Sequence, residues 1–126
     1  MILGVGIDLI EVERVKASYE RFGERFLNRI LHPAEISYCL SHKEPGPHLA
    51  ARFAAKEAIS KAFGTGIGAK LGWLDMEVGR RDSGAPFVIL HGGGLKLLEE
   101  RKGRLVFLSL SHTQAHATAV AILESE

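Results

Sequence analysis

The sequence predicts a single α+β domain, and three observations support this class. Strand-like apolar segments occupy residues 2–10, 104–111 and 116–124. Residues 48–63 are a long run of good helix formers. Helices and strands follow one another without the strand–helix–strand rhythm of a parallel sheet. The length, 126 residues, is close to the commonest size of one domain.

The N-terminal third is predicted to form one strand followed by helices. Residues 2–10 (ILGVGIDLI) have the composition of a strand. Apolar residues recur at helical spacing over residues 11–22, until Gly23 interrupts them. A proline near its start makes 33–41 a short helix. Residues 41–48 (SHKEPGPH) contain two prolines and a glycine, which predicts a loop.

The middle of the chain is predicted to form the principal helix and then a hairpin. The helix at 48–63 is followed by Gly64, a residue type that commonly ends helices. Strand-like segments at 72–80 and 85–90 are joined by the turn sequence RDSG (81–84), which favours a β-hairpin.

The C-terminal third is predicted to form a helix and two strands. Residues 94–102 are expected to be helical. The apolar runs RLVFLSLS (104–111) and HATAVAILE (116–124) follow as strands. The polar sequence SHTQA makes the turn between them.

Composition narrows the classes of partner. The chain has 16 basic and 15 acidic residues, so its charge balance gives no case for nucleic acid or a membrane surface. Its one cysteine, Cys39, cannot form an intrachain disulfide, which fits a reducing compartment. No apolar run approaches the roughly 20 residues that span a bilayer. We therefore expect a soluble, cytoplasmic protein.

Asp8 is the one charged residue in the strand predicted at 2–10. Strand alternation places Gly6, Asp8 and Ile10 on one face. A carboxylate among apolar neighbours needs an ion pair, hydrogen bonds or a bound cation. An acid near a strand end can also cap the next helix or face solvent, so position alone leaves both interpretations open.

The helix predicted at 48–63 carries the next candidates. Glu57 and Lys61 are four residues apart and share an alanine-rich face, and Arg52 and Lys56 form a second pair at this spacing. Carboxylate and phosphate oxygens together commonly hold Mg²⁺, and a lysine adds positive charge for the phosphates. The alternative is a surface salt bridge, which is common on helices.

Two turns offer possible ligand contacts. The glycines of GTGIG (64–68) follow a helix instead of preceding one, which excludes a Walker-type phosphate loop. Gly64 ends the helix, and its lack of a side chain would also let a ligand approach the backbone. His112 and Thr113 stand at a strand end and could present donors to a phosphate or ribose. An ordinary hairpin turn is the alternative.

Three arginines form a possible docking surface. Arg14, Arg21 and Arg25 fall on one stripe if the helix that starts at residue 11 continues past Gly23. Such a stripe could bind an acidic partner. Neighbouring glutamates nearly cancel its charge, so a solvated helix face is the alternative.

Three segments, in this order, resemble the signature segments of the 4′-phosphopantetheinyl transferase family. They are GIDLIEVERV (6–15), RFAAKEAISKAFGTGIG (52–68) and SLSHTQAHATAVAI (109–122). The short length and the form RFAAKEA…KAFGTGIG are similar to the short bacterial type of this family. The resemblance runs from about residue 3 to residue 122. It implies an antiparallel sheet packed against a long central helix.

The resemblance also implies a role for each candidate residue. It makes Asp8 and Glu57 the ligands of Mg²⁺, and it makes Asp8, Glu57 and Lys61 catalytic. It implies that coenzyme A is bound by Arg52, Lys61, Gly64, His112 and Thr113. It implies that Arg14, Arg21 and Arg25 bind the acyl carrier protein. From these matches we expect Asp8 to point toward the alanine face of helix 48–63, on the side that carries Lys61.

The reaction implied by the resemblance is transfer of 4′-phosphopantetheine from coenzyme A to a serine of the acyl carrier protein, in support of fatty acid biosynthesis. Adenosine 3′,5′-bisphosphate would leave by in-line displacement, with Glu57 as candidate base, directly or through a water on the metal. The family resemblance also implies a homotrimer with active sites at the subunit interfaces.

Two other classes of function remain open at this stage. One is a small metal-dependent hydrolase of phosphate esters, which would use the same Asp/Glu/Lys set with water as nucleophile. The other is a non-catalytic carrier-protein binder that keeps only the arginine stripe. The intact set of Asp8, Glu57 and Lys61 argues against the binder.

Overall fold

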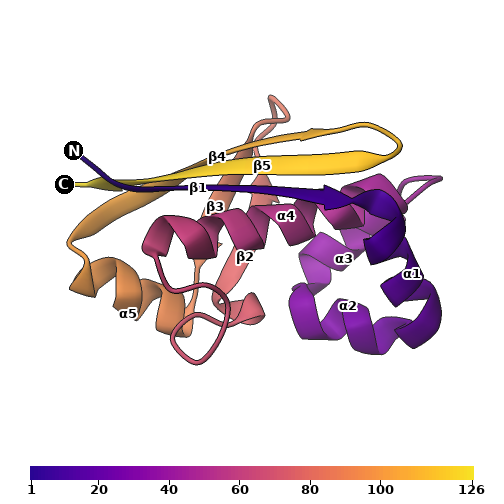
Figure 1. Cartoon of the computed structure of the whole chain (residues 1–126), viewed down its shortest axis with the longest axis horizontal. Coiled ribbons are helices and arrows are strands. Elements are labelled where there is room, and N and C mark those ends of the chain that lie inside the picture. Colours follow the sequence, from indigo (N-terminus) through magenta and orange to yellow (C-terminus); the bar gives the residue numbers. More distant parts are fainter.

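A computed structural model describes all residues, 1–126, as one layered arrangement of helices and strands (Figure 1). In chain order the elements are β1 (Ile2–Glu11), α1 (Val12–Phe22), α2 (Glu24–Ile30), α3 (Pro33–Leu40), α4 (Gly46–Phe63), a 3₁₀ helix (Trp73–Asp75), β2 (Met76–Arg80), β3 (Pro86–Leu90), α5 (Gly92–Glu100), β4 (Gly103–His112) and β5 (His116–Ser125). The predicted α+β class is confirmed. None of the helices is both long enough and apolar enough to cross a membrane.

The strands form two antiparallel sheets. The larger sheet has the order β1-β5-β4, and the hairpin β2-β3 forms the smaller one. The first and last strands pair along their whole length, so that Asp8 lies opposite Ala119. The two chain ends therefore lie side by side (Figure 1), and the Ser125 N–H donates to the Met1 carbonyl oxygen at 2.8 Å.

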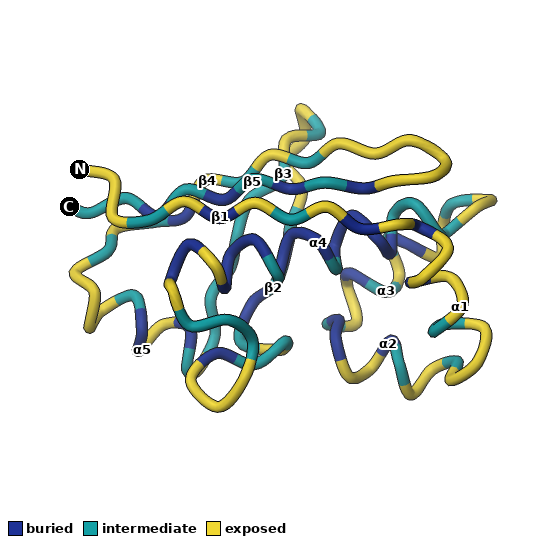
Figure 2. The backbone as a smooth tube through the Cα atoms, viewed as in Figure 1, coloured by how far each residue is buried: buried dark blue, intermediate teal, exposed yellow.

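Helix α4 runs beneath the larger sheet and forms the centre of the core (Figures 1 and 2). Small residues make this close packing possible. A Cβ atom on Gly4 would overlap the carbonyl oxygen of Ala62, and one on Gly6 would overlap that of Ala58. Strand β1 can therefore lie directly on the helix only because both positions are glycine. The expected antiparallel sheet against a long central helix is confirmed.

A buried ion pair joins α3, α4 and β2. Lys56 and Glu35 are both fully buried, and the Lys56 Nζ donates to Glu35 Oε1 at 2.9 Å and to the Ile30 carbonyl at 2.6 Å. Glu35 also accepts from the backbone N–H groups of His32 and Val78, each at 2.8 Å. The spacing of four residues from Arg52 gave no partner for Lys56, and α4 turns its side chain inward to Glu35.

Three predicted elements differ from the structure by two or more residues at one end or both. The strand expected at 72–80 begins at Met76, because the Asp75 carboxylate accepts from the Gly72 N–H at 2.8 Å and closes a 3₁₀ turn instead. Helix α4 begins at Gly46, since a proline is tolerated in a first helical turn. Helix α5 occupies Gly92–Glu100 and not 94–102, and Lys102 has a positive φ of 56° just beyond it.

The chain breaks at Gly23 into two helices. A continuous arginine stripe would have required a single helix. Gly23 has φ 58° and ψ −134°, so α1 ends at Phe22 and α2 starts in a new direction at Glu24. A positive φ favours glycine. Arg14 and Arg21 therefore share α1, whereas Arg25 belongs to α2, so the condition for one continuous stripe is not met.

Candidate active site

Asp8, Glu57 and Lys61 come together where β1 crosses α4, and we call them the acid–lysine cluster. The Lys61 Nζ donates to Asp8 Oδ1 at 3.2 Å and to the Ile7 carbonyl at 3.0 Å. The expectation that Asp8 faces the alanine side of the helix, beside Lys61, is confirmed. Lys61 forms its ion pair with Asp8 and not with Glu57.

Strand alternation directs Asp8 into this cluster. Gly6 and Ile10 are buried against α4, whereas Val5, Ile7 and Leu9 are exposed on the other face. Asp8 has the same parity as Gly6, so its carboxylate leaves the strand on the helix side. The absence of side chains at Gly4 and Gly6 then brings the strand close enough for Asp8 to reach the α4 residues.

The environment of Glu57 raises the pKa of its carboxyl group. Burial has the largest effect, the negative charge of Asp8 adds to it, and Lys61 opposes both. A bound cation would relieve the repulsion between the two carboxylates. The donor set, two carboxylates of which one is disfavoured as an anion, therefore fits a hard divalent cation such as Mg²⁺.

A second cluster surrounds Arg52, on a different face of α4. Arg52 is only 4% exposed and its Nε has no hydrogen-bond partner. Its guanidinium carbon lies 4.3 Å from the centre of the Tyr38 ring, and that of Arg80 lies 4.6 Å from the same ring. The Arg80 Nη1 also donates to the Tyr38 hydroxyl at 2.6 Å. A buried cation with an unused donor provides a place for an anion.

Three histidines continue this basic cluster toward the β4–β5 turn. The rings of His42 and His48 stack with centroids 3.5 Å apart, and His112 meets His48 at 5.0 Å. Burial, together with the nearby charges of His42, His112 and Arg52, lowers the pKa of His48 to about 4. We call Tyr38, His42, His48, Arg52, Arg80 and His112 the histidine–arginine cluster.

A hollow of about 540 Å³ opens beside this cluster. It holds both predicted turn residues, His112 and Thr113, together with His48 from α4. The remaining lining residues are His42, Lys43, Glu44, Pro47 and Gln114. Sequence reasoning missed His48, although its spacing of four residues from Arg52 was visible. Tyr38 and Arg80 carried no signal, because only the fold brings α3 and β2 to this point.

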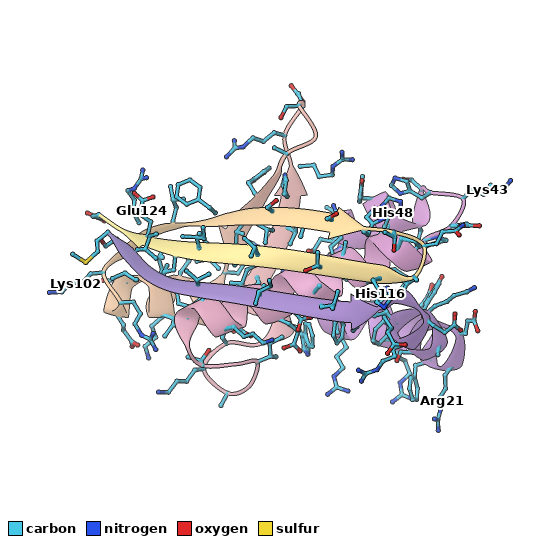
Figure 3. The ribbon with its side chains drawn as sticks, turned by 45° about the horizontal axis from the view of Figure 1, so that its top comes forward. Arg21, Lys43, His48, Lys102, His116 and Glu124 are labelled. Carbon is cyan, nitrogen blue, oxygen red and sulfur yellow. The ribbon has the colours of Figure 1, made fainter.

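The two clusters lie on opposite edges of the larger sheet. Asp8 belongs to the β1 edge, whereas His112 ends β4 on the other edge, with β5 between them. Figure 3 shows His48 and Lys43 beyond the β4 edge and Arg21 beyond the β1 edge. Along α4, the nine residues from Arg52 to Lys61 advance about 14 Å. One chain therefore does not bring all the predicted coenzyme A residues together, and Gly64 lies farther still.

The helices α1 and α2 frame a second hollow, of about 330 Å³. Arg25 lines it, together with Ser18, Phe22, Phe26 and Arg29. Arg14 and Arg21 lie one heptad apart on α1, on either side of Ser18. The surface thus combines exposed arginines with a half-exposed phenylalanine, Phe22. Phe22 and Arg29 were missed because the sequence alone did not show that the chain turns back at Gly23.

The fold and these sites define a class of transferase. The sequence model described as "4′-phosphopantetheinyl transferase superfamily" matches residues 4–121 of the chain. The chain belongs to this superfamily, as the three signature segments predicted.

Within the superfamily, similar curated relatives are holo-[acyl-carrier-protein] synthases. The holo-[acyl-carrier-protein] synthase of Koribacter versatilis is 50% identical over 124 residues, which cover 98% of this chain and 99% of the relative. That of Moorella thermoacetica is 47% identical over 98% of this chain and 95% of the relative. The predicted enzyme class, holo-[acyl-carrier-protein] synthase, is confirmed.

Solved structures of similar proteins support the same enzyme class. The Neisseria meningitidis enzyme of this name superposes with a TM-score of 0.91 at 34% identity, covering 99% of this chain and 100% of the other. The Helicobacter pylori enzyme, solved in complex with coenzyme A, gives 0.85 at 32% identity, covering 95% and 99%. The Bacillus anthracis enzyme, in complex with CoA (3′,5′-ADP), gives 0.84 at 38% identity, covering 100% and 99%.

Proposed function

We propose that the protein, as one domain spanning residues 1–126, transfers the 4′-phosphopantetheine group of coenzyme A to a serine of an acyl carrier protein. Adenosine 3′,5′-bisphosphate is released, and the product supports fatty acid biosynthesis in the cytoplasm. The observation that carries the proposal is the meeting of Asp8, Glu57 and Lys61 across the glycine–alanine contact. The names of the relatives and the coenzyme A complexes supply the substrate class.

The acid–lysine cluster is the proposed reaction centre. Asp8 and Glu57 would hold Mg²⁺, which when bound supplies neutralising charge to the diphosphate oxygens. Glu57, whose pKa is raised by burial and by Asp8, accepts the proton of the attacking serine hydroxyl. Lys61 places its ammonium group beside the leaving phosphate. Positioning and charge neutralisation account for most of the rate in such a transfer.

The histidine–arginine cluster is the proposed site for the nucleotide end of coenzyme A. Arg52 offers a buried guanidinium with an unused Nε donor, and a phosphate oxygen would satisfy it. His112 and Thr113 line the adjoining hollow. Gly64, which ends α4 in a left-handed conformation (φ 79°), leaves the backbone accessible near Lys61 for the diphosphate end.

Within one chain, the proposed sites for the diphosphate and nucleotide ends of coenzyme A lie on opposite sheet edges. The proposed enzyme is therefore a ring of three chains. The outer face of the larger sheet bears exposed apolar side chains, which an association would cover. They are Ile2, Leu3, Val5, Ile7 and Leu9 on β1 and Phe107 on β4. In a closed ring, the β1 edge of one chain meets the β4 edge of the next, which joins an acid–lysine cluster to a histidine–arginine cluster.

The proposed docking surface for the carrier protein lies on α1 and α2. Arg14, Arg21 and Arg25 supply positive charge, and Phe22 supplies an apolar contact beside them. Arginine with an aromatic residue is a composition typical of energetically important interface positions. Such a surface fits an acidic helical partner better than a neutral one.

Mass spectrometry of an unmodified carrier protein tests the proposal. Incubation with this enzyme, coenzyme A and Mg²⁺ should add one phosphopantetheine to the acceptor serine. Glu57→Gln should abolish the mass gain. Arg14→Ala should raise the KM for the carrier protein and leave kcat nearly unchanged, because it affects capture and not chemistry.

Two outcomes would contradict it. Folded wild-type protein that leaves the carrier protein unmodified would exclude the transferase assignment. Full turnover by Glu57→Gln would keep the transferase but exclude the proposed metal and base roles of Glu57.

A further inference from the structure

His32, Glu77 and His91 form a cluster of potential metal ligands outside the sites described above. His32 immediately precedes α3, Glu77 lies in β2, and His91 immediately precedes α5. One ligand atom from each residue lies within 4.8 Å of the others. All three residues are half-buried. None of them lines the 540 Å³ hollow or belongs to the acid–lysine cluster.

Hydrogen bonds already hold these side chains in place. His91 Nε2 lies 2.8 Å from Glu77 Oε1, and the His32 and His91 rings lie with centroids 4.6 Å apart at an angle of 35°. His32 Nε2 lies 2.8 Å from the Leu74 carbonyl. A carbonyl can only accept, so Nε2 carries the proton and Nδ1 keeps its lone pair. A carbonyl partner on one ring nitrogen is the usual way in which proteins orient a metal-binding histidine.

Another carboxylate fixes the backbone around the cluster. Asp75 accepts from the Gly72 N–H at 2.8 Å and from the Gly93 N–H at 3.3 Å. It therefore ties the segment before β2 to the start of α5, where His91 stands. Asp75 is engaged in these backbone bonds, whereas Glu77 contacts His91 and is the acid of the cluster.

The side chains of His32, Glu77 and His91 favour one class of cation. Two imidazoles with one carboxylate are typical of Zn²⁺ and related transition metals, whereas Mg²⁺ prefers oxygen ligands. Ligand atoms around tetrahedral zinc lie about 3.3 Å apart, given bonds of about 2.0 Å. The ligand atoms of the three residues now lie within 4.8 Å of one another, so binding of the ion would draw them together.

We propose that His32, Glu77 and His91 bind one Zn²⁺ ion, or a transition metal of similar preference, and clip the starts of α3 and α5 to β2. Binding displaces the proton shared by His91 and Glu77, and water completes the coordination. This site is distinct from the proposed Mg²⁺ site and is independent of the transferase reaction. Its effect is on the stability of the protein, because the three ligands come from separate segments and meet only in the folded state.

Calorimetric titration of the chelator-treated full chain with Zn²⁺, in excess Mg²⁺, tests the proposal. We expect one Zn²⁺ per chain and a rise in melting temperature of roughly 5–10 °C at a hundredfold excess over Kd. The variants His32→Asn and His91→Asn should each weaken binding at least about tenfold. Asparagine is a favoured residue at helix N-caps, so both variants keep a good start to their helices.

Matched controls separate this site from the other histidines. His48→Asn, in the histidine–arginine cluster, and His116→Asn, on the exposed turn, should keep full zinc affinity. Substitution with Co²⁺ should give the visible absorption of a tetrahedral site in the wild type and lose it in His91→Asn. Absence of stoichiometric binding by the wild type, or its loss in His48→Asn but not in His91→Asn, would overturn the assignment.

Discussion

At the residue scale, Lys56 shows how a charge can be buried without being a catalytic group. Its ammonium donates to Glu35, to the Ile30 carbonyl and, at 3.2 Å, to the Trp73 carbonyl. Burial lowers the pKa of Lys56, and the Glu35 carboxylate opposes this effect. Because all three ammonium protons and the Glu35 oxygens have partners, neither charge is left unpaired in the core.

We predict that Lys56→Met costs about 3–5 kcal/mol of unfolding free energy, because it leaves Glu35 buried without its cation. Urea denaturation measures this cost. Lys61→Met makes the same change five residues later on the same helix. It should cost less than about 1 kcal/mol, since the Lys61 side chain is 51% exposed. Equal costs for the two variants would contradict the view that burial decides the contribution of each lysine.

His48 gives a prediction about pH. Its pKa is about 4 in the folded protein, against about 6.5 in an unfolded chain. Between these values the unfolded state binds more protons, so the free energy of unfolding rises with pH. The contribution of His48 is fully present above about pH 6.5 and is lost as the pH falls toward 4.

We therefore expect His48→Asn to lose less stability than the wild type when the pH is lowered from 7 to 4.5. Melting temperatures across this range measure the difference. His116→Asn, on the exposed turn, should follow the wild type. A wild-type acid sensitivity that is unchanged in His48→Asn would show that His48 is not desolvated as the structure indicates.

At the element scale, the contact of β1 with α4 decides where Asp8 lies. The strand carries its large side chains, Val5, Ile7 and Leu9, outward and leaves Gly4 and Gly6 against the helix. The helix packs Ala58 and Ala62 against these two glycines. The two backbones are therefore in close contact, and the Asp8 carboxylate lies beside Lys61.

Gly6→Ala should separate these two elements. The added methyl group would overlap the Ala58 carbonyl, which belongs to the helix backbone and cannot rotate away. We expect a loss of about 1–3 kcal/mol or more of stability and a larger loss of transferase activity. Thermal melting and the mass assay measure these effects. Gly68→Ala, where nothing lies within 4 Å, is the control and should leave both nearly unchanged.

At the scale of the whole molecule, the acid–lysine and histidine–arginine clusters belong to opposite sheet edges. A site that needs both must be completed by a neighbouring chain. The exposed apolar side chains on the outer face of β1 are in the right position for such an association. In the proposed ring, oligomerisation and catalysis would depend on the same interface, because each sheet edge would supply half of the site.

Mixing inactive variants tests this arrangement. Glu57→Gln affects the β1 edge and His112→Ala the β4 edge, so each alone should be nearly inactive. Chains of the two kinds, unfolded and reassembled together, should recover up to about one quarter of wild-type activity, because that share of interfaces pairs two intact edges. A mixture of Asp8→Asn with Glu57→Gln damages one edge only and should recover nothing. Recovery in that control would exclude the composite site.

The sequence by itself determined the α+β class, most elements and the family. Local signals sufficed there: glycine after α4, strand alternation around Asp8, and three ordered segments. Tertiary structure decided the rest. The sharp turn at Gly23 divided the arginine stripe, Lys56 paired with Glu35 from another helix, and Tyr38 and Arg80 joined Arg52. The physical reason is that spacing within one element fixes which residues share a face, whereas partners distant in sequence are fixed only when the elements pack.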